Sequence, residues 1–142
     1  MPTIVITKHI DAPAVAVWAL LADFGNVKWI PVAGRVDTDG QGVGMRRLIY
    51  GSGDSPAVET LTGMDADRMI LSYRITNNPL PVSRFEAVVT LDGHTSTDTT
   101  TITWSVDYDP AQGTTAEAAH DTVESVYAMI AGWLGEAAAL RG

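Results

Sequence analysis

The stretch from Thr114 to Leu140 limits the possible folds more than any other part of the sequence. On a helical wheel with about 100° per residue, ten of its apolar residues fall within an arc of roughly 160°. That arc holds Ala119, Val123, Val126, Tyr127, Met129, Ile130, Trp133, Leu134, Ala137 and Leu140. Thr114 followed by Glu117 fits a capping box, in which the two side chains bind free backbone amides of the first turn. The sequence therefore predicts a terminal amphipathic helix of about 25 residues, ~38 Å long, which must lie along an equally broad apolar surface.

The composition narrows the class of protein. A chain of 142 residues with 46% apolar and 18% charged residues is ordinary for a globular protein, and we expect one domain over residues 1–142. Because there is no cysteine, disulfides and thiolate catalysis are excluded. His9, His94 and His120 have no i, i+4 spacing, so we expect no metal site and no cofactor.

Charge and hydropathy bear on partners and location. The net charge of −8, with only nine lysines and arginines, argues against nucleic acid as a partner, because that affinity rests on cations that neutralise phosphates. No stretch approaches the ~18 consecutive apolar residues of a membrane span, and the amino terminus has no signal pattern. We therefore expect a cytoplasmic protein with no membrane span.

The order of the other segments indicates an α+β fold. Thr3–Ile10 alternates like a strand, Ala14–Ala22 follows a proline start signal as a short helix, and Phe24–Pro31 is interpreted as a second, shorter helical piece. Strands between Gly, Asp, Asn and Pro clusters are then expected at Val32–Thr38, Met45–Gly51, Ala57–Met64, Met69–Thr76, Arg84–Asp92 and Thr99–Asp107. One long helix covers only one face of such a seven-stranded antiparallel sheet. We expect the sheet to curve around that helix and to leave a pocket, because a curved sheet and a straight helix are hard to pack without gaps.

Several short motifs accompany this order. They are Val17-Trp18 in the first helix, Trp29-Ile30-Pro31 after the second, and Gly42-Val43-Gly44 before a strand. With the terminal helix, they make the whole chain resemble the START/Bet-v-1-like (SRPBCC) superfamily, and more closely its polyketide cyclase/dehydrase-like branch. The resemblance implies a helix-grip fold, in which the curved sheet and two short helices wrap around the long C-terminal helix over an apolar cavity. Members include lipid carriers, hormone receptors and cyclases, so the fold does not choose the function.

The resemblance also implies which positions would contact a ligand. Alignment with the abscisic-acid receptors of the superfamily places cavity positions on the inner strands, after the second short helix and on the terminal helix. The binding residues expected on this basis are Trp29, Arg47, Ile49, Glu59, Tyr73, Ile75, Leu80, Val82, Phe85, Trp104, Met129, Ile130 and Trp133. The large apolar members suit a planar or aliphatic ligand, and the alternative is that they fill a solid core.

Arg47 and Glu59 stand out without any resemblance. If the chain turns about Gly53, partners across the hairpin have numbers that average 53, so these opposite charges face each other with about 5 Å between Cβ atoms. On an outer face the pair is a surface bridge worth ~0.2–1 kcal/mol. On an inner face both groups lose their hydration, and such a pair would then hold a ligand carboxylate or phenolate or move a proton. Tyr73 is a third candidate for acid–base chemistry, and the alternative is a core tyrosine with its hydroxyl in water.

Three functions of different classes remain open. The first is binding of a small hydrophobic or aromatic molecule, polyketide-like or lipid-like, in the cavity. The alternative is a polyketide cyclase or dehydratase that uses Arg47, Glu59 and Tyr73 as catalytic residues in the same cavity. A protein-interaction module is the third hypothesis, and it would require a large apolar patch outside the cavity. The sequence is compatible with a monomer or a homodimer.

Overall fold

A computed structural model of the chain describes residues 3–51, 55–76 and 81–141. Its elements are β1 (Thr3–Ile10), α1 (Ala14–Ala22), β2 (Val36–Asp39), β3 (Arg46–Ile49), β4 (Ala57–Asp65), β5 (Ile70–Thr76), β6 (Val82–His94), β7 (Thr99–Pro110) and α2 (Ala116–Arg141). The strands form one antiparallel sheet in the order β1-β7-β6-β5-β4-β3-β2. The strands from β2 to β7 therefore form a meander, and β1 joins its far side by pairing with β7.

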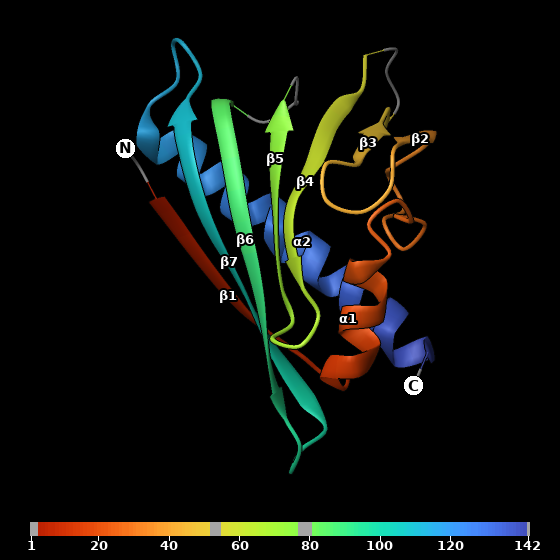
Figure 1. The fold of residues 1–142 in the computed structure, drawn as a ribbon. Coiled ribbons are helices and arrows are strands. Elements are labelled where there is room, and N and C mark those ends of the chain that lie inside the picture. Colours follow the sequence, from red (N-terminus) through yellow and green to blue (C-terminus); the bar gives the residue numbers. More distant parts are fainter. Residues whose placement is uncertain (1–2, 52–54, 77–80, 142) are drawn as a thin grey trace.

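The arrangement in space is that of the predicted fold class. The long strands bend, α2 crosses one face of the sheet diagonally, and α1 lies beside the carboxyl-terminal half of α2 (Figure 1). Along β7, Ile102, Trp104, Val106 and Tyr108 are buried and alternate with more exposed neighbours, as a strand with one covered face requires. The predicted curved seven-stranded sheet and long terminal helix are confirmed. In the described part of the chain, no helix is long and apolar enough to cross a membrane.

The buried face of α2 is rotated away from the predicted arc. The buried residues of the helix are Ala119, Val123, Tyr127, Ala131, Leu134 and Ala138, spaced three or four apart as on one helical face. Met129 and Leu140, at the edge of the predicted arc, are 52% and 90% exposed. Alanine adds little hydrophobic weight to a wheel, yet its small side chain lets a helix lie close to a sheet. The buried face therefore turns toward Ala131 and Ala138.

The first turn of α2 differs by one residue from the prediction. Thr115 rather than Thr114 caps the helix, since its Oγ1 accepts a hydrogen bond of 3.0 Å from the amide of Ala118. The capping box between Thr114 and Glu117 is therefore not formed. Glu117 still lies in the first turn, where a negative charge interacts favourably with the helix dipole.

The second short helix of the expected fold is absent from the described residues. Residues 24–31 form a series of turns, one of them closed by a bond of 2.9 Å from the amide of Asn26 to the carbonyl of Asp23. The Asn26 side chain also accepts a bond from the amide of Lys28 at 3.1 Å, and local bonds of this kind compete with helix formation. One short helix, α1, thus accompanies α2 in the structure.

Strand β2 begins at Val36, four residues later than the expected Val32. The cause is Gly34, which has a φ of 64° and forms a bridge with Gly51. A Cβ atom at position 34 would lie 2.1 Å from the carbonyl oxygen of Gly51, so only glycine fits this close approach. Residues 23–35 therefore form one long connection without regular structure, which we call the α1–β2 loop.

Candidate functional site

Arg47 and Glu59 face each other across β3 and β4, in the register that the hairpin arithmetic predicted. Both side chains are only 13% exposed, so the pair lies on the inner face of the sheet. The Nε and Nη2 atoms of Arg47 donate to Oε1 of Glu59 at 2.8 and 2.5 Å. Nη1 donates to the backbone carbonyl of Phe24 at 2.8 Å, and the guanidinium lies 3.8 Å from the centre of the Phe24 ring. Charge-assisted bonds and the ring contact together offset the cost of removing the two charges from water.

A pair of buried tyrosines lies next to these charges. The hydroxyls of Tyr73 on β5 and Tyr127 on α2 are 2.6 Å apart, and both residues are buried. Burial, followed by the negative charge of Glu59, raises the pKa of Tyr73 above its usual value. Burial also raises the pKa of Tyr127, with further contributions from Tyr73 and Glu59. Both phenols are therefore protonated at neutral pH, and one hydroxyl donates its hydrogen to the oxygen of the other.

Aromatic rings surround Tyr127 and hold it in place. Its ring stacks on Phe85 with centroids 6.0 Å apart and planes at 8°. It also meets Trp104 at 5.1 Å in a tilted arrangement. Contacts of this geometry add to the stability that burial alone provides. The tyrosine hydroxyl is consequently fixed at the point where α2 approaches β5, β6 and β7.

These side chains enclose a small cavity of about 50 Å³ between the sheet and α2. The residues that line it are Leu21, Phe24, Trp29, Ile30, Arg47, Glu59, Leu71, Tyr73, Val89, Trp104, Tyr127 and Ile130. Binding sites for small molecules usually measure ~300–1,000 Å³, so this space is far smaller than the pocket expected from the sequence. The reason is that rings from β6, β7 and α2 fill most of the interior.

One buried polar atom of a residue that lines the cavity has no partner. The indole Nε1–H of Trp29 is buried and makes no hydrogen bond with the residues that the structure describes. Buried donors are paired in the great majority of cases, since an unpaired donor loses its bond to water without compensation. Trp29 reaches the cavity from the α1–β2 loop, which sequence reasoning had interpreted as partly helical.

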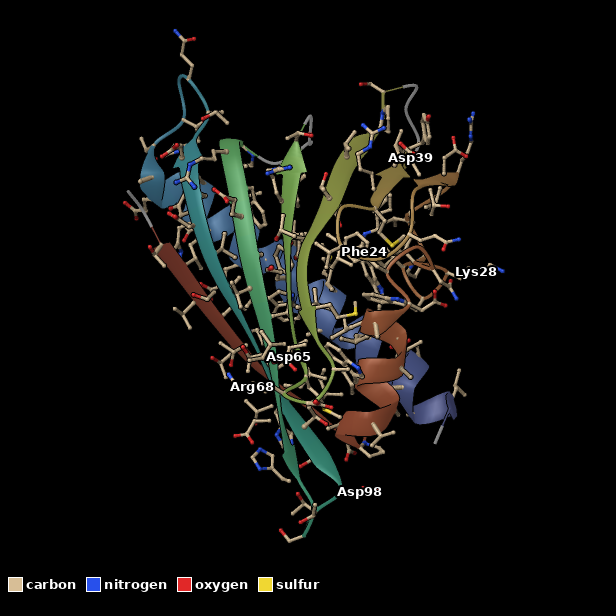
Figure 2. All side chains as sticks on the ribbon, viewed as in Figure 1. Phe24, Lys28, Asp39, Asp65, Arg68 and Asp98 are labelled. Atoms are coloured by element: carbon tan, nitrogen blue, oxygen red, sulfur yellow. The ribbon has the colours of Figure 1, made fainter. Side chains whose placement is uncertain are left out.

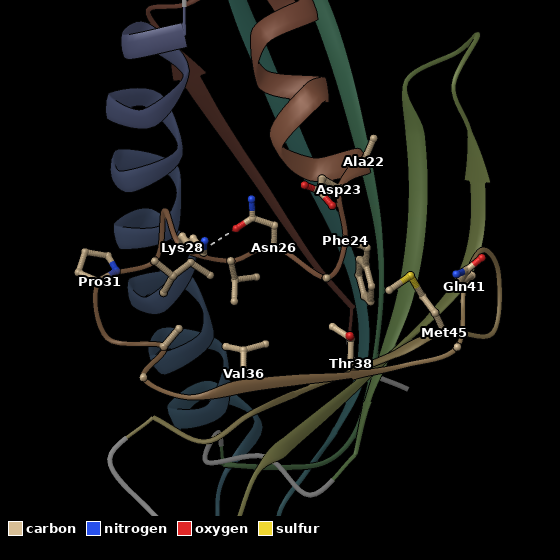
Figure 3. Close-up of a pocket in the computed structure, with 16 residues that line it drawn as sticks. Ala22, Asp23, Phe24, Asn26, Lys28, Pro31, Val36, Thr38, Gln41 and Met45 are labelled. Atoms are coloured by element: carbon tan, nitrogen blue, oxygen red, sulfur yellow. Dashed lines mark hydrogen bonds between the residues drawn. The ribbon is translucent and has the colours of Figure 1, made fainter.

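A second, larger space lies on the other side of the α1–β2 loop. It is an open groove of about 910 Å³ between this loop and the β2–β3 hairpin (Figure 3). Its lining residues are Ala22, Asp23, Phe24, Gly25, Asn26, Val27, Lys28, Ile30, Pro31, Ala33, Gly34, Val36, Thr38, Gly40, Gln41 and Met45. Phe24 and Ile30 line both the groove and the inner cavity, so they form the wall between the two spaces. Lys28 extends outward from the same loop (Figure 2).

Six of the binding residues expected from the sequence line the inner cavity, namely Trp29, Arg47, Glu59, Tyr73, Trp104 and Ile130. Ile75, Val82 and Phe85 are buried in the core without lining it, and Ile49 and Trp133 are half-buried outside it. Leu80 lies outside the described residues.

Met129, another expected binding residue, is 52% exposed and does not line the inner cavity. It is two residues from Tyr127, about 200° around the helix, and so points away from the sheet.

Sequence reasoning missed the residues that complete the cavity. The cavity residues that were not among the expected binding residues are Leu21, Phe24, Ile30, Leu71, Val89 and Tyr127, although Tyr127 lay in the predicted arc of the terminal helix. Its polar role depends on Tyr73, 54 residues away, and no local pattern links the two. A signal for the groove was present in the glycines and the proline between residues 25 and 44, which favour loops over regular structure.

A curved antiparallel sheet that closes on a long terminal helix, with polar side chains buried between them, defines a helix-grip protein. The family model described as "Polyketide cyclase / dehydrase and lipid transport" matches residues 1–134. The chain belongs to this family, within the Bet v 1-like (SRPBCC) superfamily. A comparison with curated proteins finds no match.

Solved structures with the same fold include bacterial and Bet v 1-like proteins. A protein from Nitrosospira multiformis is 26% identical, with a TM-score of 0.79 over 95% of this chain and 94% of that one. The protein XoxI from Bacillus cereus is 22% identical, with a TM-score of 0.82 over 96% and 95%. Ara h 8.0201 is 14% identical, with a TM-score of 0.77 over 96% and 97%. The last two likenesses concern the fold alone.

Proposed function

We propose that this protein binds a small hydrophobic or aromatic molecule, polyketide-like or lipid-like, between the sheet and α2. One observation carries the proposal: a buried ion pair and a buried tyrosine pair border a cavity whose other walls are apolar. Buried charge is costly and is commonly kept where it has a role. The family, whose description names lipid transport and polyketide chemistry, supports the same class of ligand.

A ligand of this size requires a larger cavity, and a movement of the α1–β2 loop would enlarge it. Phe24 and Ile30 line both the inner space of about 50 Å³ and the groove of about 910 Å³. Their loop is held by turns rather than by a continuous hydrogen-bonded element, so moving it disrupts few backbone bonds. Displacement of Phe24 and Ile30 would join the two spaces into one chamber with a polar inner end.

Two matched tryptophan substitutions on α2 test the proposal. The fluorescent fatty acid cis-parinaric acid should bind the wild-type protein in the micromolar range. Ile130→Trp fills the cavity and should abolish binding, whereas Met129→Trp, on the exposed side of the same helix, should leave it unchanged. The proposal fails if no probe from a panel of fatty acids and aromatic ketones binds, or if the two variants bind equally.

Catalysis of a cyclase or dehydratase type is the second candidate. It is favoured by Glu59, which accepts both bonds from Arg47 through Oε1 and leaves Oε2 without a hydrogen-bond partner among the described residues. A carboxylate oxygen next to a substrate is able to accept a proton. In that case the wild type should convert a poly-β-ketone analogue into a product. Glu59→Gln should bind the same analogue with unchanged affinity but release it unaltered.

A further inference from the structure

The buried indole N–H of Trp29 defines what the polar end of a ligand must offer. Trp29 is one of the residues that line the cavity, and the hydrogen on its Nε1 has no acceptor among the described residues. An indole nitrogen only donates, so the missing partner must be an acceptor atom.

The neighbouring groups do not supply that acceptor. Oε1 of Glu59 binds two nitrogens of Arg47, Oε2 makes no hydrogen bond to Trp29, and the tyrosine hydroxyls bond each other. The positive charge of Arg47 is balanced by Glu59, so the cavity offers no net charge to hold an anion. A neutral acceptor on an apolar molecule matches this environment better than a carboxylate does.

We infer that Trp29 Nε1 donates a hydrogen bond to a carbonyl oxygen of the ligand, and that the natural ligand is an uncharged ketone, ester or lactone. This inference rests on the proposed binding function and adds the chemical class of the ligand. Trp29 then acts as a specificity-determining residue, since hydrocarbons of the same shape leave its N–H unpaired in the complex. The apolar body of the ligand lies against the ring faces of the cavity wall and toward the Phe24 side.

A matched pair of probes tests this directly. The compounds 2-acetylnaphthalene and 2-isopropenylnaphthalene have nearly the same shape and differ in a carbonyl against a methylene group. By calorimetric titration, the wild type should bind the ketone about fivefold more tightly than the hydrocarbon, as one net hydrogen bond provides. Trp29→Phe should bind both compounds equally, with its affinity for the hydrocarbon within about twofold of wild type. Trp18→Phe, a tryptophan outside the cavity wall, should keep the preference.

Nuclear magnetic resonance of the wild type gives a second readout that does not depend on a variant retaining affinity. The indole N–H signal missing from the spectrum of Trp29→Phe should move downfield when the ketone is added and stay in place when the hydrocarbon is added. If neither compound binds the wild type while cis-parinaric acid does, this inference is overturned and the binding function stands. If no member of the probe panel binds, the proposed function is overturned as well. If both bind equally and the indole signal does not respond to the ketone, the inference is overturned while the binding function stands.

Discussion

The hydroxyls of Tyr73 and Tyr127 lie 2.6 Å apart, and their hydrogen bond joins β5 to α2 inside the core. The bond is therefore a polar link between the sheet and the helix that covers it. Arg47 and Glu59 line the same cavity, so a continuous group of polar side chains replaces part of the apolar contact between the two layers. Each member of this group depends on its partner, and paired substitutions reveal that dependence.

The tyrosine pair should show strong non-additivity. Tyr127→Phe leaves the hydroxyl of Tyr73 buried without its partner, and we expect a loss of about 1–3 kcal/mol in the free energy of unfolding. The double change Tyr73→Phe/Tyr127→Phe removes both polar groups and should cost less than the sum of the single changes. Urea unfolding of the four proteins measures this difference. Additive losses would mean that the two hydroxyls do not interact in solution.

The buried ion pair between β3 and β4 should behave differently from an exposed pair between β2 and β3. Arg47→Met or Glu59→Leu alone leaves an unpaired charge and should cost ~3–5 kcal/mol, whereas the double substitution should cost much less. Arg46 and Asp39 form the control, because their side chains are 50% and 61% exposed. Removing either should cost under ~1 kcal/mol. Equal coupling in the two pairs would contradict the buried position of Arg47 and Glu59.

Stability should fall at alkaline pH because of the same tyrosines. Burial raises the pKa of Tyr73 and Tyr127 in the folded state above the unfolded value of about 10. Above pH ~10 the unfolded chain therefore releases protons that the folded chain retains. The stabilisation is complete below pH ~10 and is lost as the pH rises toward the folded pKa. Melting temperatures between pH 8 and 11.5 measure it. The double phenylalanine variant should have a flatter alkaline slope, and an unchanged slope would refute this origin.

Phe24 should control the rate at which ligands enter. Phe24→Ala removes most of the wall between the groove and the inner cavity and should increase the association rate of cis-parinaric acid in stopped-flow fluorescence. It should also reduce the free energy of unfolding by ~3–5 kcal/mol, because a buried ring is lost. Val36→Ala, which lines only the groove, is the control and should leave the rate unchanged. An association rate that is the same in Phe24→Ala and wild type would place the entry elsewhere.

The regular elements were predictable because their periodicity is local. The alternation in the strands and the arc of the terminal helix were enough for the sheet and for α2, and the turn symmetry correctly paired Arg47 with Glu59. The exact buried face of α2 was not predictable from the sequence. Alanines such as Ala131 determine it, because their small side chains allow close packing although they add little hydrophobicity. The partnership of Tyr127 with Tyr73 depends on the tertiary fold alone.

The α1–β2 loop was the part least accessible to sequence reasoning. The run Phe24–Pro31 was interpreted as a second helical piece that ends at the proline, but the side chain of Asn26 accepts a hydrogen bond from the amide of Lys28 and the chain turns instead. The same loop carries Phe24, Trp29 and Ile30 into the cavity wall, so an error in its secondary structure also conceals how the cavity is closed.

A crystal structure of the protein with 2-acetylnaphthalene tests the binding site most directly. We predict the ligand between the sheet and α2, its carbonyl oxygen within hydrogen-bond distance of Trp29 Nε1, and the Phe24 ring displaced toward the groove. A ligand held only in the outer groove, with Phe24 in place and the inner cavity still about 50 Å³, would contradict the proposed site.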